Sequence, residues 1–205
     1  MNSAFTTHIQ EDGLLYLTAS SLSVPSLAHG FSTRLGGVSR GVFAALNLGL
    51  HRGDSTENVQ ENYRRFCAVL GVAPQRCVLA RQVHRDDVKV VTAQDAGAGL
   101  LRPQDYEADA LVTNVPGLTL TIFSADCIPT LYFDPVTRCI GAAHAGWRGT
   151  ALGIAAKAVE RMVDCYGCDR LDILAAVGPG ISKCCFETHE DVPNAMTEAM
   201  GAAAL

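Results

Sequence analysis

The sequence predicts an α+β protein with a mixed, mostly antiparallel sheet. Strand-like and helix-like segments are mixed along the chain, without the regular strand–helix alternation of a parallel sheet. Within residues 120–145, two apolar strand patterns flank the turn sequence Asp134-Pro-Val-Thr137, which is typical of an antiparallel hairpin. Both faces of this hairpin are largely apolar, so we expect it to be covered on both sides.

Composition limits the kind of protein. The 205 residues are 48% hydrophobic and 18% charged, which suits a single folded domain over residues 1–205, with two small domains as the alternative. The net charge is −5 and no block of lysine and arginine occurs, so we expect no nucleic-acid partner, although a small anion remains a suitable ligand. No run reaches the roughly 18 apolar residues of a membrane span, and the N-terminus lacks a secretory pattern. We expect a cytoplasmic protein with no membrane partner and with its eight cysteines reduced; the sequence does not define an oligomeric state.

Short runs of apolar and β-branched residues, bounded by turn residues, predict further strands outside the hairpin. Residues 1–28 otherwise resemble an irregular lead-in, and the glycines after Arg34 predict a turn with N–H groups facing outward. The expected strands are residues 14–18, 28–33, 77–83, 88–91, 110–112, 118–124 and 171–177.

Three segments have helical patterns. Residues 54–55 offer N-caps for a helix that runs to Leu70 and stops at Gly71. A second helix is expected to begin at residues 149–150, and residues 190–205 form an alanine-rich third helix. The expected buried face of the second helix consists of Leu152, Ala155, Ala156, Val159, Met162 and Val163.

The hairpin brings a cysteine and a histidine together. If Asp134 and Thr137 close the turn, an unbulged hairpin makes Cys127 the direct partner of His144, with Cβ atoms about 4.5–5.5 Å apart. A thiolate and an imidazole at that distance can share a proton or a metal ion. Pro129 lacks an N–H and indicates an edge strand or a bulge, and a one-residue bulge would shift this pair.

Two chemistries follow from these side chains. With His84, which follows a strand end, Cys127 and His144 form a donor set suited to zinc, with a fourth position open for water or substrate. Without a metal, Cys127 would be a nucleophile and His144 its base. Alternatively, His84 is a core histidine that forms a hydrogen bond with the backbone. Asp126 needs partners inside an apolar run, so we expect it to orient a ligand or to anchor the strand.

Cationic groups beside the glycine turns are candidates for holding an anion. Arg34 and Arg148 could bind phosphate with help from loop N–H groups, and ion pairs are the alternative for both. Trp147 could stack on a flat ring, although a lone tryptophan usually belongs to the core. Cys165 and Cys168 have redox or zinc spacing but no second pair. The cysteines expected to be core residues are Cys67, Cys77, Cys139, Cys184 and Cys185.

Seven motifs in a fixed order resemble the YfiH/laccase-domain family (DUF152). Its members are described as purine nucleoside phosphorylases and formerly carried the name multicopper polyphenol oxidases, and the resemblance spans residues 28–190. The motifs are His29-Gly-Phe-Ser-Thr-Arg34-Leu-Gly-Gly-Val-Ser39, Leu46-Asn-Leu-Gly49, Arg81-Gln-Val-His84, Ala108-Asp109-Ala-Leu-Val-Thr113, Ala125-Asp-Cys127-Ile-Pro129, His144-Ala-Gly-Trp-Arg-Gly149 and Gly178-Pro-Gly-Ile181.

The resemblance implies a layered α/β sandwich related to cysteine hydrolases. It implies a zinc site whose metal ligands and catalytic residues are His84, Cys127 and His144. It also implies phosphorolysis of adenosine, inosine, guanosine and methylthioadenosine, together with adenosine deamination. The expected partners are therefore purine nucleosides and phosphate. Candidates for binding them within the motifs are Arg34, Asn47, Gln82 and Arg148.

Other functions remain open at this stage. Copper is the alternative metal, in a polyphenol oxidase, but one set of two histidines and one cysteine cannot supply the several copper sites that four-electron oxygen reduction needs. A metal-free cysteine hydrolase or amidase acting on peptidoglycan precursors is a second alternative, and a non-catalytic interaction domain is a third. Family members usually continue through a Cys-Thr segment and an aromatic-Ser-Tyr-Arg stretch, so we expect this chain to lack the family's C-terminal segment.

Overall fold

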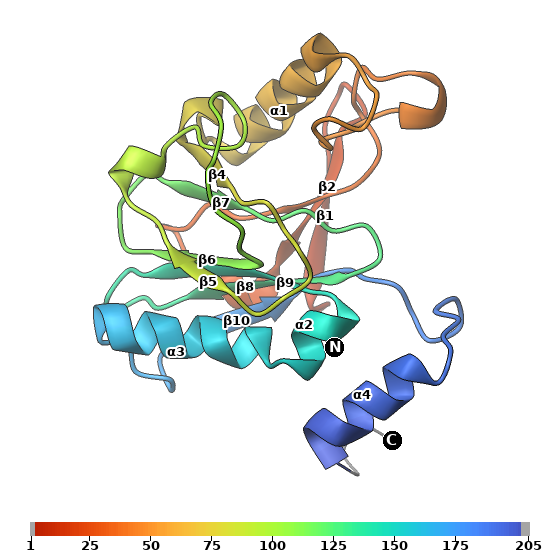
Figure 1. Ribbon diagram of the computed structural model, residues 1–205. Helices are drawn as coiled ribbons and strands as arrows, with labels where there is room; N and C mark the ends of the chain where they lie inside the picture. Colours follow the sequence, from red (N-terminus) through yellow and green to blue (C-terminus); the bar gives the residue numbers. More distant parts are fainter. Residues whose placement is uncertain (1–2, 202–205) are drawn as a thin grey trace. The chain divides into compact units, whose positions relative to one another are not determined.

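The computed structural model describes residues 3–201 and divides into two compact units, with the boundary between Cys77 and Val78 (Figure 1). Each unit is described by itself. The single domain expected over residues 1–205 stays a prediction. No helix among the described residues is long and apolar enough to cross a membrane.

The N-terminal unit contains a three-stranded antiparallel sheet and one long helix. The strands are β1 (Phe5–Ile9), β2 (Leu15–Ala19) and β3 (Phe31–Ser32), in that order. The prediction of an irregular lead-in is wrong for β1, which pairs with β2 along its whole length. Its sequence, Phe-Thr-Thr-His-Ile, lacks an alternating apolar pattern, so only the pairing partner reveals it. Short 3-10 helices are η1 (Ser20–Leu22), η2 (Gly41–Phe43) and η3 (Pro74–Arg76).

Helix α1 (Thr56–Leu70) has the predicted ends. The Ser55 side chain accepts a hydrogen bond from the backbone N–H of Asn58, and Gly71 adopts a left-handed conformation with φ of 68°. These two local signals confirm the predicted start and stop of the helix. The helix buries Val59, Tyr63 and Cys67 on one face.

The C-terminal unit is built on a five-stranded mixed sheet. Three of its four strand pairs are antiparallel, and β5 and β6 form the parallel pair. This confirms the predicted mixed, mostly antiparallel sheet. The order is β10 (Leu174–Val177), β8 (Ile128–Phe133), β9 (Ile140–Ala145), β6 (Ala110–Thr113) and β5 (Val88–Val90).

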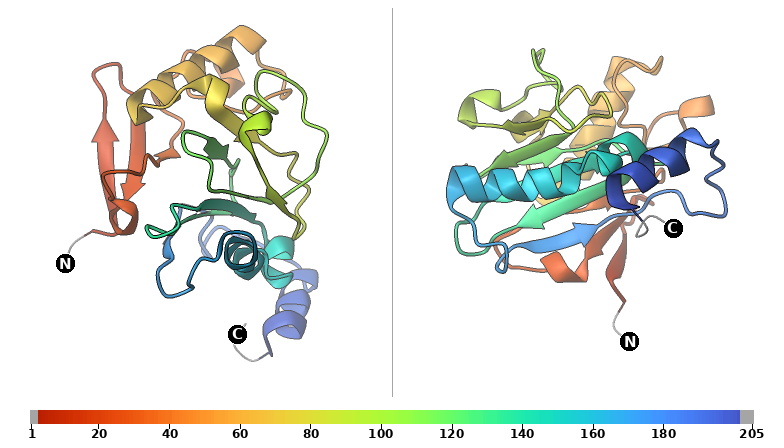
Figure 2. Two further views of the ribbon diagram at one scale, coloured as in Figure 1. Left: turned by 90° about the vertical axis from the view of Figure 1, so that its left-hand side faces the viewer. Right: turned by 60° about the horizontal axis from the view of Figure 1, so that its bottom comes forward.

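Both faces of this sheet are covered, in agreement with the prediction that its β8–β9 hairpin is covered on both sides (Figure 2). Alternating residues of β6 separate the two faces, with Ala110 and Val112 facing one core and Leu111 the other. Helix α3 (Ile154–Tyr166) packs on the first face. The two-stranded sheet of β4 (Cys77–Leu79) and β7 (Thr119–Thr121) and the 3-10 helix η4 (Ala93–Asp95) belong to the other layer.

The hairpin of β8 and β9 has a different register from the predicted one. Pro129, rather than Cys127, is the partner of His144, and the loop closes with Asp134 donating its N–H to the carbonyl of Cys139. A two-residue hairpin loop needs a positive φ at its first position, which Pro135 cannot adopt. The loop is therefore longer. The pairing register differs from the predicted one by an even number of residues, so Cys127 and His144 stay on the same side of the sheet.

The predicted helix at residues 149–150 is two helices. Helix α2 (Trp147–Ala151) ends before Gly153, whose φ is 77°, and α3 then starts at Ile154. The break changes the phase of the apolar face, so Leu152 and Ala156, both predicted to be buried, are exposed. The side chains of α3 that become fully buried are Ile154, Ala158 and Met162.

Several predicted ends also differ. The strands expected at 77–83, 118–124 and 171–177 are shorter, as β4, β7 and β10. The last helix, α4 (Asp191–Met200), ends before Gly201, and the rest of the helix predicted to residue 205 lies outside the described residues.

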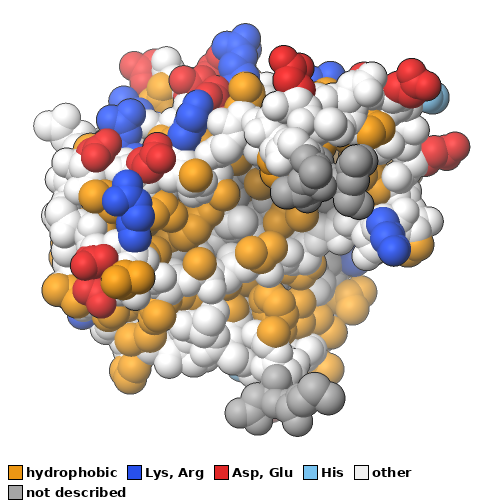
Figure 3. Space-filling view, turned by 90° about the horizontal axis from the view of Figure 1, so that it is seen from below, with side chains coloured by type: hydrophobic (Ala, Val, Ile, Leu, Met, Phe, Trp, Pro, Cys, Tyr) orange, Lys and Arg blue, Asp and Glu red, His pale blue; other side chains and the backbone are white. Residues whose placement is uncertain are grey.

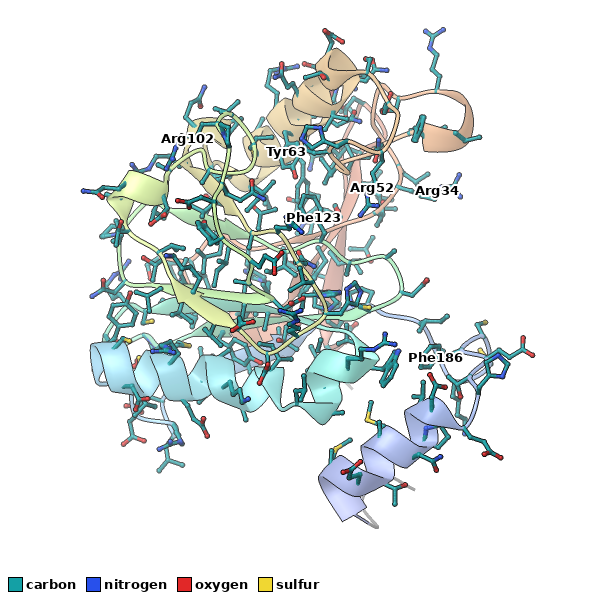
Figure 4. All side chains as sticks on the ribbon, viewed as in Figure 1. Arg34, Arg52, Tyr63, Arg102, Phe123 and Phe186 are labelled. Carbon is teal, nitrogen blue, oxygen red and sulfur yellow. The ribbon has the colours of Figure 1, made fainter. Side chains whose placement is uncertain are left out.

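The surface of the C-terminal unit is partly apolar. Helix α4 buries none of its described side chains and contacts α2. Figure 3 shows hydrophobic side chains on the side where α3 and α4 lie in Figure 1. Exposed large hydrophobic residues of this unit include Leu152, Leu171, Val177, Phe186 and Met200, and Figure 4 labels Phe186 on the segment that leads into α4.

Candidate metal centre

Three side chains from distant parts of the C-terminal unit meet at one point. One ligand atom from each of His84, Cys127 and His144 lies within 4.8 Å of the others. The two imidazole rings are perpendicular, with centroids 4.7 Å apart. His144 is buried, Cys127 is half-buried and His84 is exposed, so the cluster opens to the surface on the His84 side. Among the described residues, no other group of three or more histidine, cysteine, aspartate or glutamate side chains is close enough together to hold a metal ion.

Each residue comes from a different structural element. His144 lies near the end of β9, Cys127 immediately precedes β8, and His84 lies in the loop between β4 and β5. Because Cys127 and His144 are diagonal rather than direct neighbours across the hairpin, their contact depends on the segment before β8. His84 depends on long-range interactions, and a buried carboxylate supplies them.

Asp109 organises the centre. This side chain is completely buried and accepts hydrogen bonds from the backbone N–H groups of Val83, His84 and Arg85, at 2.9–3.1 Å. It also accepts from Nδ1 of His144, at 2.8 Å. One carboxylate therefore fixes both histidine-bearing segments. Burial by itself would raise the pKa of Asp109, but the hydrogen bonds from Arg85, His144, Val83 and His84 outweigh it and lower the pKa.

His84 has an uncommon backbone conformation, with φ of 61°. A residue other than glycine costs about 1–2 kcal/mol in this left-handed region. The Asp109 carboxylate offsets this cost, because the turn directs three successive N–H groups toward it.

The hydrogen bond to Asp109 also fixes the tautomer of His144. Since a carboxylate accepts, Nδ1 of His144 carries the proton, and Nε2 keeps its lone pair for a ligand. This carboxylate–histidine arrangement is typical of metal-binding histidines. Asp126, the other candidate for orienting a ligand, is exposed, and its backbone carbonyl accepts from the N–H of Ile181.

Gly146 lies directly against the side chains of all three candidate ligands. A Cβ atom at this position would lie 3.0 Å from Cδ2 of His84, 3.1 Å from Sγ of Cys127 and 3.7 Å from Cε1 of His144. Its φ of −68° is accessible to any residue, so only the space among the ligands requires glycine here. Gly180 has a similar role beside Cys127, because a Cβ there would lie 2.8 Å from Ile128 and 3.2 Å from the Asp126 carbonyl oxygen.

We expect Gly146→Ala to weaken metal binding about 10- to 100-fold, with zinc as the probe ion, because the added methyl group displaces the ligands by a few tenths of an ångström. The measurement is competition for zinc with a chromophoric chelator. Gly141→Ala is the matched control, since its Cβ would be equally crowded, 3.1 Å from Sδ of Met162, but in the core and away from the ligands. Equal zinc affinity in the two variants would show that Gly146 does not face a metal site.

The donor set fits a borderline or soft metal ion. Two imidazoles and one sulfur, with the fourth direction open, suit zinc, and copper accepts the same donors. Burial raises the pKa of the Cys127 thiol, and the charges of Asp126 and Asp109 raise it further. A cation at the centre would reverse this effect by favouring the thiolate.

The other candidate residues have observed structural partners. The Gln82 amide is bonded to the backbone of Phe123. Arg148 is exposed and lies over the Trp147 ring, 4.1 Å from its centroid. In the N-terminal unit, Asn47 donates to Asp54. Arg34 extends from the loop after β3 into solvent and donates to the Ala44 carbonyl (Figure 4).

Asp109 was not assigned a role from the sequence. A signal was present, because Asp109 opens the apolar strand Ala110–Thr113 and an acidic residue there needs buried partners. The cysteine predictions were mixed: Cys67, Cys77 and Cys139 are buried as predicted, whereas the prediction of core packing is wrong for Cys184 and Cys185, which are exposed at a turn. The structure contains no disulfide among the eight cysteines, all of which lie within residues 3–201, and their reduced state stays a prediction.

The layered α/β fold and the His-Cys-His centre together are those of a known protein family. The family model described as "Multi-copper polyphenol oxidoreductase laccase" matches residues 28–205. The chain belongs to this family, which is the YfiH/DUF152 family.

Curated relatives carry a different name. A protein of Deinococcus radiodurans, called "Purine nucleoside phosphorylase", is 47% identical over 180 residues, which is 88% of this chain and 66% of that protein. "Purine nucleoside phosphorylase YfiH" of Escherichia coli is 37% identical over 164 residues, 80% of this chain and 63% of that protein. The chain thus spans slightly less than two thirds of the length of these relatives.

Solved structures have the same fold. YlmD from Geobacillus stearothermophilus superposes with a TM-score of 0.86 and 35% identity, over 96% of this chain and 72% of that chain. The hypothetical protein YfiH of Bacillus licheniformis gives 0.81 and 36%, over 85% and 66%. These comparisons confirm the layered sandwich.

Proposed function

We propose that this chain carries the active centre of a zinc-dependent purine nucleoside phosphorylase. The proposed substrates are phosphate and adenosine, inosine, guanosine or methylthioadenosine, and the same centre would deaminate adenosine. The names of the relatives support the reaction. The observation that carries the proposal is the convergence of His84, Cys127 and His144 within 4.8 Å, held by a buried carboxylate.

His84, Cys127 and His144 would hold the zinc ion. When bound, the ion supplies Lewis acidity, which polarises an oxygen or nitrogen of the substrate. The chain's own contribution is to fix the donors before the substrate arrives. Asp109 keeps the Nδ1 proton on His144, and Gly146 keeps side-chain atoms out of the space between the ligands.

In phosphorolysis, an oxygen of hydrogen phosphate forms a bond to C1′ of the ribose while the glycosidic bond breaks. The electron pair of that bond leaves with the purine, which takes up the proton that the phosphate gives up. Phosphate needs cationic partners in this step. Arg148 follows Gly146 by two residues and is exposed, so its guanidinium is the candidate in the C-terminal unit. Arg34 and Asn47 are candidates from the N-terminal unit, and their contribution to this site stays a prediction.

The metal-free cysteine hydrolase is the second candidate function. It needs a thiolate at Cys127, yet burial and neighbouring carboxylates raise the pKa of this thiol and favour its protonated form at neutral pH. The hydrogen bond from Nδ1 of His144 to Asp109 fits both functions, because a catalytic histidine base is oriented by a carboxylate in the same way. The direction of the Cys127 pKa is therefore the observation that favours the metal enzyme.

The copper oxidase suggested by the family description needs several copper ions. Within residues 3–201, one cluster with the composition of a metal site occurs. Copper therefore remains an alternative occupant of that cluster, and a multicopper reaction has less support than phosphorolysis.

A phosphate-dependent assay tests the proposed function. Zinc-loaded protein is incubated with adenosine, with and without phosphate, and adenine, hypoxanthine, ribose 1-phosphate and inosine are quantified. We expect ribose 1-phosphate to equal the sum of adenine and hypoxanthine and to form only when phosphate is present, and we expect inosine in both cases. Purine release that does not depend on phosphate, or no release from zinc-loaded protein, would contradict the proposal.

A further inference from the structure

The side chain of Gln82 is bonded at both ends to one remote residue. Its Nε2 donates to the carbonyl oxygen of Phe123 at 2.8 Å, and its Oε1 accepts from the N–H of Phe123 at 2.7 Å. Gln82 and Phe123 are 41 residues apart in the sequence. The Gln82 amide thus binds the N–H and the C=O of Phe123 in the way that a neighbouring β-strand would.

This contact connects the segments that carry two of the three donors. Gln82 precedes His84 by two residues, and Phe123, labelled in Figure 4 on the segment between β7 and β8, precedes Cys127 by four. Within residues 3–201, the hydrogen bonds that join segment 81–85 to segment 122–127 are the two made by Gln82.

The other hydrogen bonds of these two segments are made to other parts of the unit. Asp109 ties the His84 segment to His144, and Ile181 ties Asp126 to the segment after β10. These interactions link His84 to Cys127 only through third elements, whereas the Gln82 amide joins the two segments directly. We therefore infer that Gln82 is a positioning residue that sets the separation of the His84 and Cys127 ligand atoms.

An amide is required for this role. Both bonds need a donor and an acceptor on the same planar group. A glutamate at this position would place a second acceptor against the Phe123 carbonyl oxygen, and an asparagine would be one methylene too short. Because the amide is held against Phe123 by a bond at each end, we expect Gln82 to act on the reaction through the position of the ligands.

This inference depends on the metal centre of the proposed function but not on the nucleoside substrate. Its test is therefore zinc affinity in the absence of substrate, by chelator competition, for Gln82→Met and Gln82→Asn. We expect zinc binding to weaken about 10- to 100-fold in both variants, the range typical for residues that support ligands. Gln94→Met is the matched control, since Gln94 is exposed in η4 and belongs to no part of the centre.

Kinetics separate positioning from substrate binding. With zinc in excess, we expect kcat of the Gln82 variants to recover and KM for adenosine to equal that of the wild type. If Gln82→Met does not fold, Gln82→Asn and Gln82→Glu keep the polarity of the site and carry the test. Zinc affinity equal to that of Gln94→Met would overturn the inference, as would a raised KM that excess zinc does not restore. If wild type binds zinc but does not cleave nucleosides, the proposed function fails while the inference on Gln82 stands.

Discussion

Cys127→Ala is expected to remove zinc from the purified protein and to lower phosphate-dependent cleavage of adenosine by more than about 100-fold, because loss of residues that only support metal ligands already costs about 10- to 100-fold. Cys127 supplies the sulfur of the cluster. The two histidines that remain hold zinc far less tightly than a three-donor set.

The measurements are zinc content by mass spectrometry and initial rates of adenine release. Cys165→Ala is the control, because that thiol is also free but exposed at the end of α3. Retention of zinc and activity by Cys127→Ala would exclude Cys127 as a ligand. A wild-type protein that is free of zinc, active, and inactivated by thiol alkylation would instead support the cysteine hydrolase.

Asp109→Asn is the second change with a large expected effect. The amide cannot accept all the hydrogen bonds that the carboxylate accepts, so buried N–H groups of the His84 segment lose their partner. We expect the free energy of unfolding to fall by about 3 kcal/mol. We also expect zinc affinity to fall about 10- to 100-fold, since in either orientation the amide NH2 group replaces an oxygen that accepts from His144 and His84 or from Val83 and Arg85.

Asp134→Asn separates the two effects. Asp134 is equally buried and accepts from Val136 and Thr137 at the opposite end of the β8–β9 hairpin, in the turn rather than at the metal centre. Urea unfolding and chelator competition are measured for both variants. Asp134→Asn should lose stability with unchanged zinc affinity. Equal zinc affinities for Asp109→Asn and Asp134→Asn would show that Asp109 is only a structural carboxylate.

Local signals predicted the parts of the fold that depend on neighbouring residues. Helix α1 begins after Ser55 and ends at Gly71, because both caps act within one turn of the chain. The mixed sheet follows from the order of strands and turns. The break at Gly153 was missed because a glycine inside an apolar helical pattern has two outcomes, a weak point or a left-handed stop, and packing selects between them.

The centre was predicted from residue types and the resemblance to a family, but its geometry was not. The predicted direct pairing of Cys127 and His144 was wrong, because Pro135 requires a longer loop. Asp109 and Gln82 act across separations of 24 to 41 residues, and no local pattern in the sequence encodes such contacts. The sequence shows that Asp109 and Gln82 are polar residues at the ends of apolar strands, but only the structure shows which residues they bind.

We propose that one zinc ion binds to two imidazoles and one thiolate of this chain, those of His84, His144 and Cys127. X-ray absorption at the zinc edge of the zinc-loaded protein tests it directly. We expect one sulfur at about 2.3 Å and two nitrogens at about 2.0–2.1 Å, with the sulfur signal absent in Cys127→Ala. A coordination sphere that contains only oxygen and nitrogen in the wild-type protein would contradict the claim.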